Sequence, residues 1–209
     1  MDTPYPKNVF INCPFDTQYK GIFEAVVFAV FACGFQPRCS LEVDDGAQIR
    51  MSKISGIIGG CKFGIHDISK TELDELNGLP RFNMPLELGM FLGAKQYGPP
   101  KQKEKVCLIL DREDYRYQKF ISDISGQDIR VHGNDPKVAI SLVRNWLRNA
   151  TPETTMPGGE AIGERYNAFR ADLPGMCRDI GLVESQLTYL DYTWLISQWQ
   201  KVEERRESL

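Results

Sequence analysis

The sequence predicts an α/β fold: a three-layer, flavodoxin-like open sheet of five parallel strands, with a C-terminal helical extension. Short runs of β-branched and apolar residues alternate along the chain with longer segments of helical period, as they do in βαβ units. The continuous apolar run at residues 105–110 (KVCLIL) is typical of a parallel strand that is buried on both faces.

Five segments have the composition of strands: residues 9–13, 35–41, 63–68, 105–110 and 129–132. Pro37 weakens the second of them, because proline cannot donate to a sheet ladder. Helical periodicity or capping residues predict helices at residues 19–33, from Asp44 or Asp45 to 61, and at 84–97, 115–124, 135–148, 161–180 and 186–206. Gly34 is a plausible C-cap for the first helix.

The chain divides by composition into an α/β domain at residues 1–150, a linker at 151–160 (TPETTMPGGE) and a helical extension at 161–209. The helix at residues 19–33 is apolar on all faces, so we expect it to be deeply buried or to form an oligomer contact. Trp194 and Trp199 indicate that the last helix docks on another element.

The length and the net charge of the chain limit the classes of function that it can have. The chain has 209 residues, enough for one domain with a small appendage. Hydrophobic residues make up 42% of it and charged residues 25%, so a packed core is expected. Its 25 basic and 28 acidic residues leave a net charge of -3, and no global field attracts a polyanion. We therefore expect no nucleic-acid partner.

The cysteines and the N-terminus favour a cytoplasmic protein. The six cysteines mostly lie in apolar runs and form no C-x-x-C pair, which favours buried, reduced thiols over disulfides or a metal site. The N-terminal segment MDTPYPKNVF lacks the features of a signal peptide, and no stretch approaches the roughly 18 apolar residues that span a membrane. We expect no membrane partner, no metal and no resident cofactor.

Ligands of open parallel sheets bind beyond the carboxyl ends of the strands. The side chains expected there are Asn12, Phe15, Asp16 and Tyr19 after the first strand, Asp67 and Ser69 after the third, and Asn83 with Glu87 on the next helix. Asn83 and Glu87 are four residues apart and therefore share one helix face. Backbone amides at the helix start would keep the Glu87 carboxylate ionised, and it either complements the helix dipole or works on a ligand.

Residues 60–95 (GCKFGIHDISKTELDELNGLPRFNMPLELGMFLGAK) resemble the pattern of TIR-like and nucleoside 2-deoxyribosyltransferase-like domains. In that pattern a strand ends in Asp, here Asp67, and a later helix opens with Asn and then Glu-Leu-Gly, here Asn83 and Glu87-Leu88-Gly89. The segment FINCPFD resembles the first strand and ligand loop of the same superfamily, and the resemblance covers roughly residues 8–150. Pro85 and Leu86 depart from the TIR-like pattern and leave the substrate open.

The resemblance implies N-glycosidic chemistry. Glu87 would stabilise an oxocarbenium-like centre or attack the anomeric carbon as a nucleophile. Phe15 would stack on a base, Asn12 and Asp16 would contact sugar or base edges, and Gly89 would allow close helix packing. Asp67 or Asp16 would donate a proton if the leaving group were a neutral purine.

Simpler interpretations stand beside these roles. Phe15 fits a core position equally well, and Asn12 and Asp16 fit residues that shape the turn after Pro14. Arg50 would reach a phosphate or lie in solvent. His66 precedes Asp67 on a strand, so the two side chains point to opposite faces and give no support for a Ser-His-Asp triad. Neither a P-loop nor a Rossmann motif is present.

The first functional hypothesis is an N-glycosidase that acts on NAD or a related nucleotide, working as a homo-oligomer in a bacterial defence or signalling system. Alternatives are a nucleoside or nucleotide 2-deoxyribosyltransferase and a nucleotide-sensing module without turnover.

Overall fold

The computed structural model describes residues 4–73 and 78–207. Its centre is a five-stranded sheet with the order β2-β1-β3-β4-β5, and every pair of neighbouring strands is parallel. The strands are β1 (Asn8–Asn12), β2 (Gln36–Arg38), β3 (Phe63–Asp67), β4 (Val106–Asp111) and β5 (Ile129–Val131). The chain runs from β1 to β2 on one side and then crosses to β3 on the other, so the order confirms the flavodoxin-like open sheet.

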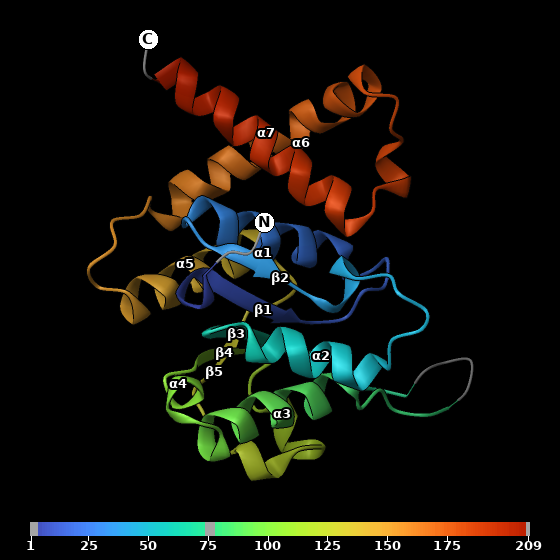
Figure 1. Cartoon of the computed structure of the whole chain (residues 1–209), viewed down its shortest axis with the longest axis vertical. Coiled ribbons are helices and arrows are strands. Elements are labelled where there is room, and N and C mark those ends of the chain that lie inside the picture. Colours follow the sequence, from blue (N-terminus) through green and yellow to red (C-terminus); the bar gives the residue numbers. More distant parts are fainter. Residues whose placement is uncertain (1–3, 74–77, 208–209) are drawn as a thin grey trace.

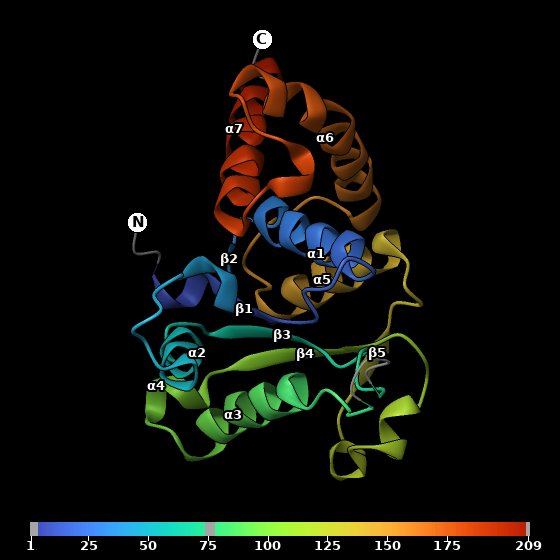
Figure 2. The same ribbon diagram turned by 90° about the vertical axis from the view of Figure 1, so that its right-hand side faces the viewer.

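Helices cover both faces of the sheet (Figure 1). One face carries α1 (Lys20–Ala32) and α5 (Pro136–Ala150), and the other carries α2 (Arg50–Gly59) and α3 (Asn83–Tyr97), followed by the short α4 (Pro100–Lys103). The C-terminal extension consists of α6 (Gly159–Asp179) and α7 (Tyr189–Glu207). Figure 2 shows these two helices as an outer layer over α1 and α5, with which they make contacts.

The chemistry of the helix ends explains most of the boundaries. Gly34 has a left-handed φ of 79°, as the residue after a helix often does, and α1 ends there as expected. Asp135 accepts a hydrogen bond from the backbone N–H of Lys137 at 2.8 Å, and Pro136 occupies the first helical position of α5.

The start of one expected helix is wrong, and a second expected helix is absent. Asp44 and Asp45 do not cap α2, which begins at Arg50; Asp45 instead accepts from the backbone N–H of Ala47 within the preceding loop, at 3.0 Å. The segment 115–124 forms two 3-10 turns, η3 (Arg116–Lys119) and η4 (Ser122–Ile124), in place of an α-helix. Between the two turns, Phe120 (φ -139°, ψ -18°) and Ile121 (φ -146°, ψ 57°) leave the helical region, so the segment does not form one continuous helix.

The outer layer explains why α1 is apolar on every face. Its inner side packs against the sheet, and its outer side packs against α6 and α7 in one continuous hydrophobic core. Phe28 of α1 stacks on Phe169 with a centroid distance of 5.4 Å and contacts Trp199 at 6.0 Å. Trp199 is buried, as a docked last helix requires, whereas Trp194 is half exposed. Of the two alternatives expected for this helix, deep burial therefore accounts for the apolar surface of α1.

The cysteines are all free thiols, as expected, and only Cys107 is partly exposed. Within the described ranges, none of the helices combines the length and apolar character needed to cross a bilayer.

Candidate functional site

A pocket of about 390 Å³ opens beyond the carboxyl end of β1, next to β3, where the strand order reverses. This volume is within the range of small-molecule sites. The loop after β1, the first turn of α2 and the start of α3 supply its walls: Asn12, Cys13, Pro14, Phe15, Asp16, Arg50, Arg81, Asn83, Met84 and Glu87. Six of the nine predicted site residues are among them, and Arg81 is a wall residue that sequence reasoning missed.

Glu87 is the buried carboxylate of this pocket. Its side chain lies on α3 and is only 7% exposed. Burial raises the pKa of the carboxyl group, and the positive charge of Arg50 across the pocket opposes that rise. In the part of the chain that the structure describes, no group donates a hydrogen bond or forms an ion pair with Glu87. The carboxylate therefore keeps its hydrogen-bonding capacity for a ligand.

The expectation that backbone amides would hold this carboxylate is wrong. Helix α3 begins at Asn83, so Glu87 lies beyond the first turn, where the free N–H groups are. The backbone N–H of Leu86, one residue earlier, already donates to Phe82 within the helix at 2.9 Å. Desolvation therefore dominates the electrostatics of Glu87.

Asn12 links the strands and the helix beside the pocket through its side-chain amide. Its side-chain nitrogen donates to the carbonyl oxygen of Met84 at 2.8 Å and to Nδ1 of His66 at 3.1 Å. Both amide hydrogens are used, so only the amide oxygen is left for a ligand. The second bond places the His66 proton on Nε2, and burial lowers the pKa of His66 to about 3, which keeps the imidazole neutral. Asn12 thus joins β1, β3 and the first turn of α3.

The loop after β1 is braced at Asp16. One carboxylate oxygen accepts from the backbone N–H of Tyr19 at 3.0 Å and lies 3.7 Å from Nζ of Lys70. The other lies 3.4 Å from a guanidinium nitrogen of Arg81. The turn-shaping role of Asp16 is therefore present in the structure. Phe15 beside it packs edge-to-face on Phe23 at a centroid distance of 5.3 Å and remains 40% exposed.

Arg50 and Asn83 both line the pocket. Arg50 is the first residue of α2, and Asn83 is the first residue of α3; both side chains are exposed. With Arg81, they give the pocket mouth two guanidinium groups and one amide. Guanidinium groups are well suited to phosphate oxygens.

Tyr19, Asp67 and Ser69 lie outside the walls of this pocket. They form a separate, almost fully buried network with His132, a residue that the sequence did not indicate. The hydroxyl of Tyr19 donates to Oδ2 of Asp67 at 2.6 Å, and Nε2 of His132 lies 2.9 Å from the same oxygen. The backbone N–H of Ser69 donates to Oδ1 of Asp67 at 2.8 Å. His132 directly follows β5, and that position at the same sheet edge is the signal that would have found it.

This network has the residue types of a hydrolytic triad but the wrong geometry. The backbone N–H of Asn134 donates to Nδ1 of His132 at 2.9 Å, so the imidazole proton is on Nε2. Both Asp67 and the Ser69 hydroxyl, at 3.0 Å, face that same protonated nitrogen. A triad needs the serine and the carboxylate on different nitrogens, so Ser69 has no base. The network instead fastens the start of α1 to β3 and to the loop after β5.

The glycine that close packing requires is Gly64 rather than Gly89. A Cβ atom at Gly89 would have open space, so the role that the resemblance implied for it is wrong. A Cβ atom at Gly64 on β3 would lie 2.7 Å from the ring of Phe91 and 2.8 Å from Nε2 of His66. Glycine at this position lets α3 pack closely on the sheet.

The described residues contain no group of three or more His, Cys, Asp or Glu side chains placed to hold a metal ion. No family model matches the chain, and searches of curated proteins and of solved structures find no match.

Proposed function

We propose that this protein cleaves the N-glycosidic bond of NAD or a related nucleotide, with Glu87 as the catalytic carboxylate. The observation that carries the proposal is the position of Glu87: a buried carboxylate with a raised pKa, in the wall of a pocket at the strand-order reversal. Proteins seldom bury a carboxylate without a partner, because desolvation is costly, and such groups cluster at working sites. The resemblance to TIR-like domains points to the same residue.

The chemistry suits a carboxylate of this kind. Breaking the bond between ribose and a base leaves positive charge on the anomeric carbon, and a carboxylate in a desolvated wall stabilises that charge strongly. A direct attack by Glu87 on the anomeric carbon would instead give a covalent intermediate that water hydrolyses. Arg50 and Arg81 would bind phosphate groups, and the partly exposed ring of Phe15 would stack on a base.

The arrangement of the two neighbouring carboxyl groups, Asp67 and Asp16, favours a substrate whose base is positively charged before it leaves. Nicotinamide in NAD is a pyridinium and leaves as a neutral molecule, so it needs no proton. A neutral purine needs a general acid. Asp67 is enclosed in the His132 network, and Asp16 is engaged by Lys70 and Arg81. Neither carboxyl group is arranged to donate a proton into the pocket, which supports NAD over a neutral nucleoside.

Product analysis tests the proposal. Purified protein is incubated with NAD, and the release of nicotinamide and ADP-ribose is followed by chromatography. We expect Glu87→Gln to lower the rate by about 100-fold or more, since it removes the charge that stabilises the transition state. Glu164→Gln on the exposed side of α6 should leave the rate unchanged. Cleavage that persists undiminished in Glu87→Gln would sink the assignment of this residue.

The same preparation separates the alternatives. Base exchange between deoxynucleosides and a free base, without hydrolysis, would identify a 2-deoxyribosyltransferase. A nucleotide that raises the melting temperature without any turnover would identify a sensing module, because a ligand that binds only the native state stabilises it.

A further inference from the structure

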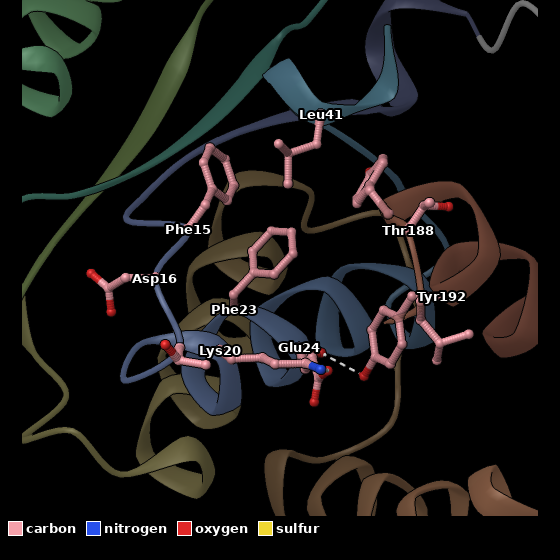
Figure 3. A pocket seen from close by; sticks show the side chains of 11 residues that line it. Phe15, Asp16, Lys20, Phe23, Glu24, Leu41, Thr188 and Tyr192 are labelled. Carbon is pink, nitrogen blue, oxygen red and sulfur yellow. Dashed lines mark hydrogen bonds and ion pairs between the residues drawn. The ribbon is translucent and has the colours of Figure 1, made fainter. Parts of the chain in front are cut away.

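A second pocket, of about 220 Å³, lies where the loop after β1 and the start of α1 meet the C-terminal extension (Figure 3). Its walls are Phe15, Asp16, Thr17, Lys20, Phe23, Glu24, Leu41, Leu187, Thr188, Tyr189 and Tyr192. The last four belong to the segment that leads into α7 and to the first turn of that helix. This pocket therefore exists only because the extension folds back over α1.

The two pockets share a wall. Phe15 and Asp16 line both of them. In Figure 3 the rings of Phe15 and Phe23 lie beside each other, while Asp16 points away from them. Phe23 lies 6.1 Å from the ring of Tyr189, so aromatic rings run from the shared wall to the extension. A ligand that occupies both pockets would therefore have to cross Phe15 and Asp16.

Hydrogen bonds and ion pairs hold the walls of the second pocket in place. The hydroxyl of Tyr189 donates to the carbonyl oxygen of Pro37 at 2.7 Å, and the hydroxyl of Tyr192 donates to that of Glu24 at 3.3 Å. Arg170 of α6 bridges the carboxylates of Glu24 and Glu184 at 3.0 and 2.9 Å. The aromatic rings are thereby fixed before any ligand arrives.

The size and lining of this pocket limit its occupant. Pockets that take a whole small molecule usually measure about 300–1,000 Å³, so this one takes a fragment, and its aromatic lining suits a planar ring. Charges of both signs surround the shared wall: Lys70 and Arg81 lie 3.7 and 3.4 Å from the Asp16 carboxylate, and Lys20 lies 3.7 Å from that of Glu24. The four cations, Lys20, Arg50, Lys70 and Arg81, outnumber by one the three carboxylates, Asp16, Glu24 and Glu87. A linker that crosses between the pockets is therefore best matched by an anionic group.

We propose that the second pocket receives the non-reacting base of a dinucleotide whose other half is bound beside Glu87. The assignment rests on the proposed function of the Glu87 pocket and narrows its substrate class. A substrate with two bases joined by phosphates fills both pockets and places its linker at the shared wall. A mononucleotide leaves the second pocket empty. The C-terminal extension thus acts as the element that selects dinucleotides.

Filling the pocket tests this assignment. Leu41 lines the pocket and is 44% exposed, whereas Leu190 is 58% exposed and lies outside the lining. Trp is introduced at each, and kcat/KM is measured for NAD and for nicotinamide mononucleotide. We expect the wild type and Leu190→Trp to prefer NAD, and Leu41→Trp to lose about 10-fold or more of that preference, the scale of one stacked base. The efficiency with the mononucleotide should not change.

A binding measurement separates this proposal from that of Glu87. ADP-ribose carries the second base but no nicotinamide, and ribose 5-phosphate lacks both; each is titrated by calorimetry into the wild type and the two Trp variants. Binding of ADP-ribose that weakens in Leu41→Trp alone supports the pocket even if NAD is never cleaved. If Leu41→Trp does not fold, Thr17→Trp fills the same pocket from another wall. Failure of the wild type to bind ADP-ribose, or equal binding by every variant, would overturn the assignment.

Discussion

The position of Glu87 costs stability, because burial desolvates its carboxylate. The helix start at Asn83 leaves this carboxylate one turn too far along the chain for amide support, and the positive charge of Arg50 opposes the rise in its pKa. A residue that lowers the stability of a protein and lines a pocket is usually retained for function rather than for folding.

Replacing the carboxylate should therefore stabilise the protein. Burial raises the pKa of Glu87 in the folded state above its ordinary value of 4.5, so the folded state binds more protons than the unfolded state between the two pKa values. Stability contributed by this group is lost as the pH rises through that window. We expect Glu87→Gln to melt at a higher temperature than the wild type at neutral pH, and the difference to shrink below the ordinary pKa. Equal or lower melting temperatures at neutral pH would contradict the assigned burial.

Arg50 should set the acid limit of activity. In the proposed mechanism the working form of Glu87 is ionised, so kcat/KM should fall as the pH drops through its raised pKa. Removing the positive charge in Arg50→Gln raises that pKa further, and the acid limb of the pH profile should move to higher pH. Arg130→Gln, an exposed arginine on β5, serves as the control. An acid limb that does not move in Arg50→Gln would show that another group governs it.

At the residue scale, the spacing of residues in the sequence predicted the members of the Glu87 pocket better than those of the His132 network. Asn83 and Glu87 are neighbours along one helix, and Asn12 to Asp16 follow one strand, so local geometry places them. The partner of Asp67 and Ser69 is His132, which is 63 residues beyond Ser69 and meets it only through the order of the strands. Such a contact follows from the strand order of the predicted fold, whereas residue spacing along one element gives no sign of it.

At the element scale, boundaries followed capping chemistry. Gly34 and Asp135 marked helix ends correctly, because one supplies a left-handed residue and the other an acceptor for free N–H groups. The helix predicted at residues 115–124 is wrong, because the apolar residues of this segment pack against β4 and α3 from two 3-10 turns. Arg116 in the first turn also pairs with Asp111 at 2.7 Å. Tertiary contacts of this kind override local helical preference.

The His132 network should contribute to stability by fastening α1 to β3. Tyr19→Phe removes the hydroxyl that donates to the buried Asp67 at 2.6 Å and leaves the carboxylate one donor short. We expect a loss of about 1–3 kcal/mol in the free energy of unfolding, measured by urea denaturation. Tyr97→Phe, at an exposed end of α3, should change it by less than about 0.5 kcal/mol. A neutral Tyr19→Phe would mean that the bond carries no net stability.

At the scale of the whole molecule, the linker composition of residues 151–160 suggested a separate appendage, whereas the hydrophobic core runs without a break from the sheet through α1 into α6 and α7. Linker composition describes the connection and says little about what the connected helices pack against. The uniformly apolar surface of α1 was the informative feature, because it requires cover on both sides.

The last helix offers a matched pair that tests this shared core. Trp199 is 5% exposed and donates from Nε1 to Asp172 at 2.9 Å, whereas Trp194 on the same helix is 49% exposed. We expect Trp199→Ala to lower the free energy of unfolding by about 3–5 kcal/mol and Trp194→Ala by less than about 1 kcal/mol. Both should unfold in one cooperative transition. A separate early transition for the helical extension would show that it folds as its own unit.

The central claim is that Glu87 faces the anomeric carbon of a nucleotide in the pocket at the β1–β3 boundary. A crystal structure of Glu87→Gln with NAD tests it most directly, because the variant keeps the shape of the side chain and leaves the substrate intact. We predict that the anomeric carbon of the nicotinamide ribose lies within about 3.5 Å of the side chain at position 87, the separation of reacting atoms in a near-attack geometry. NAD bound elsewhere, or bound with that carbon turned away from position 87, would contradict the account.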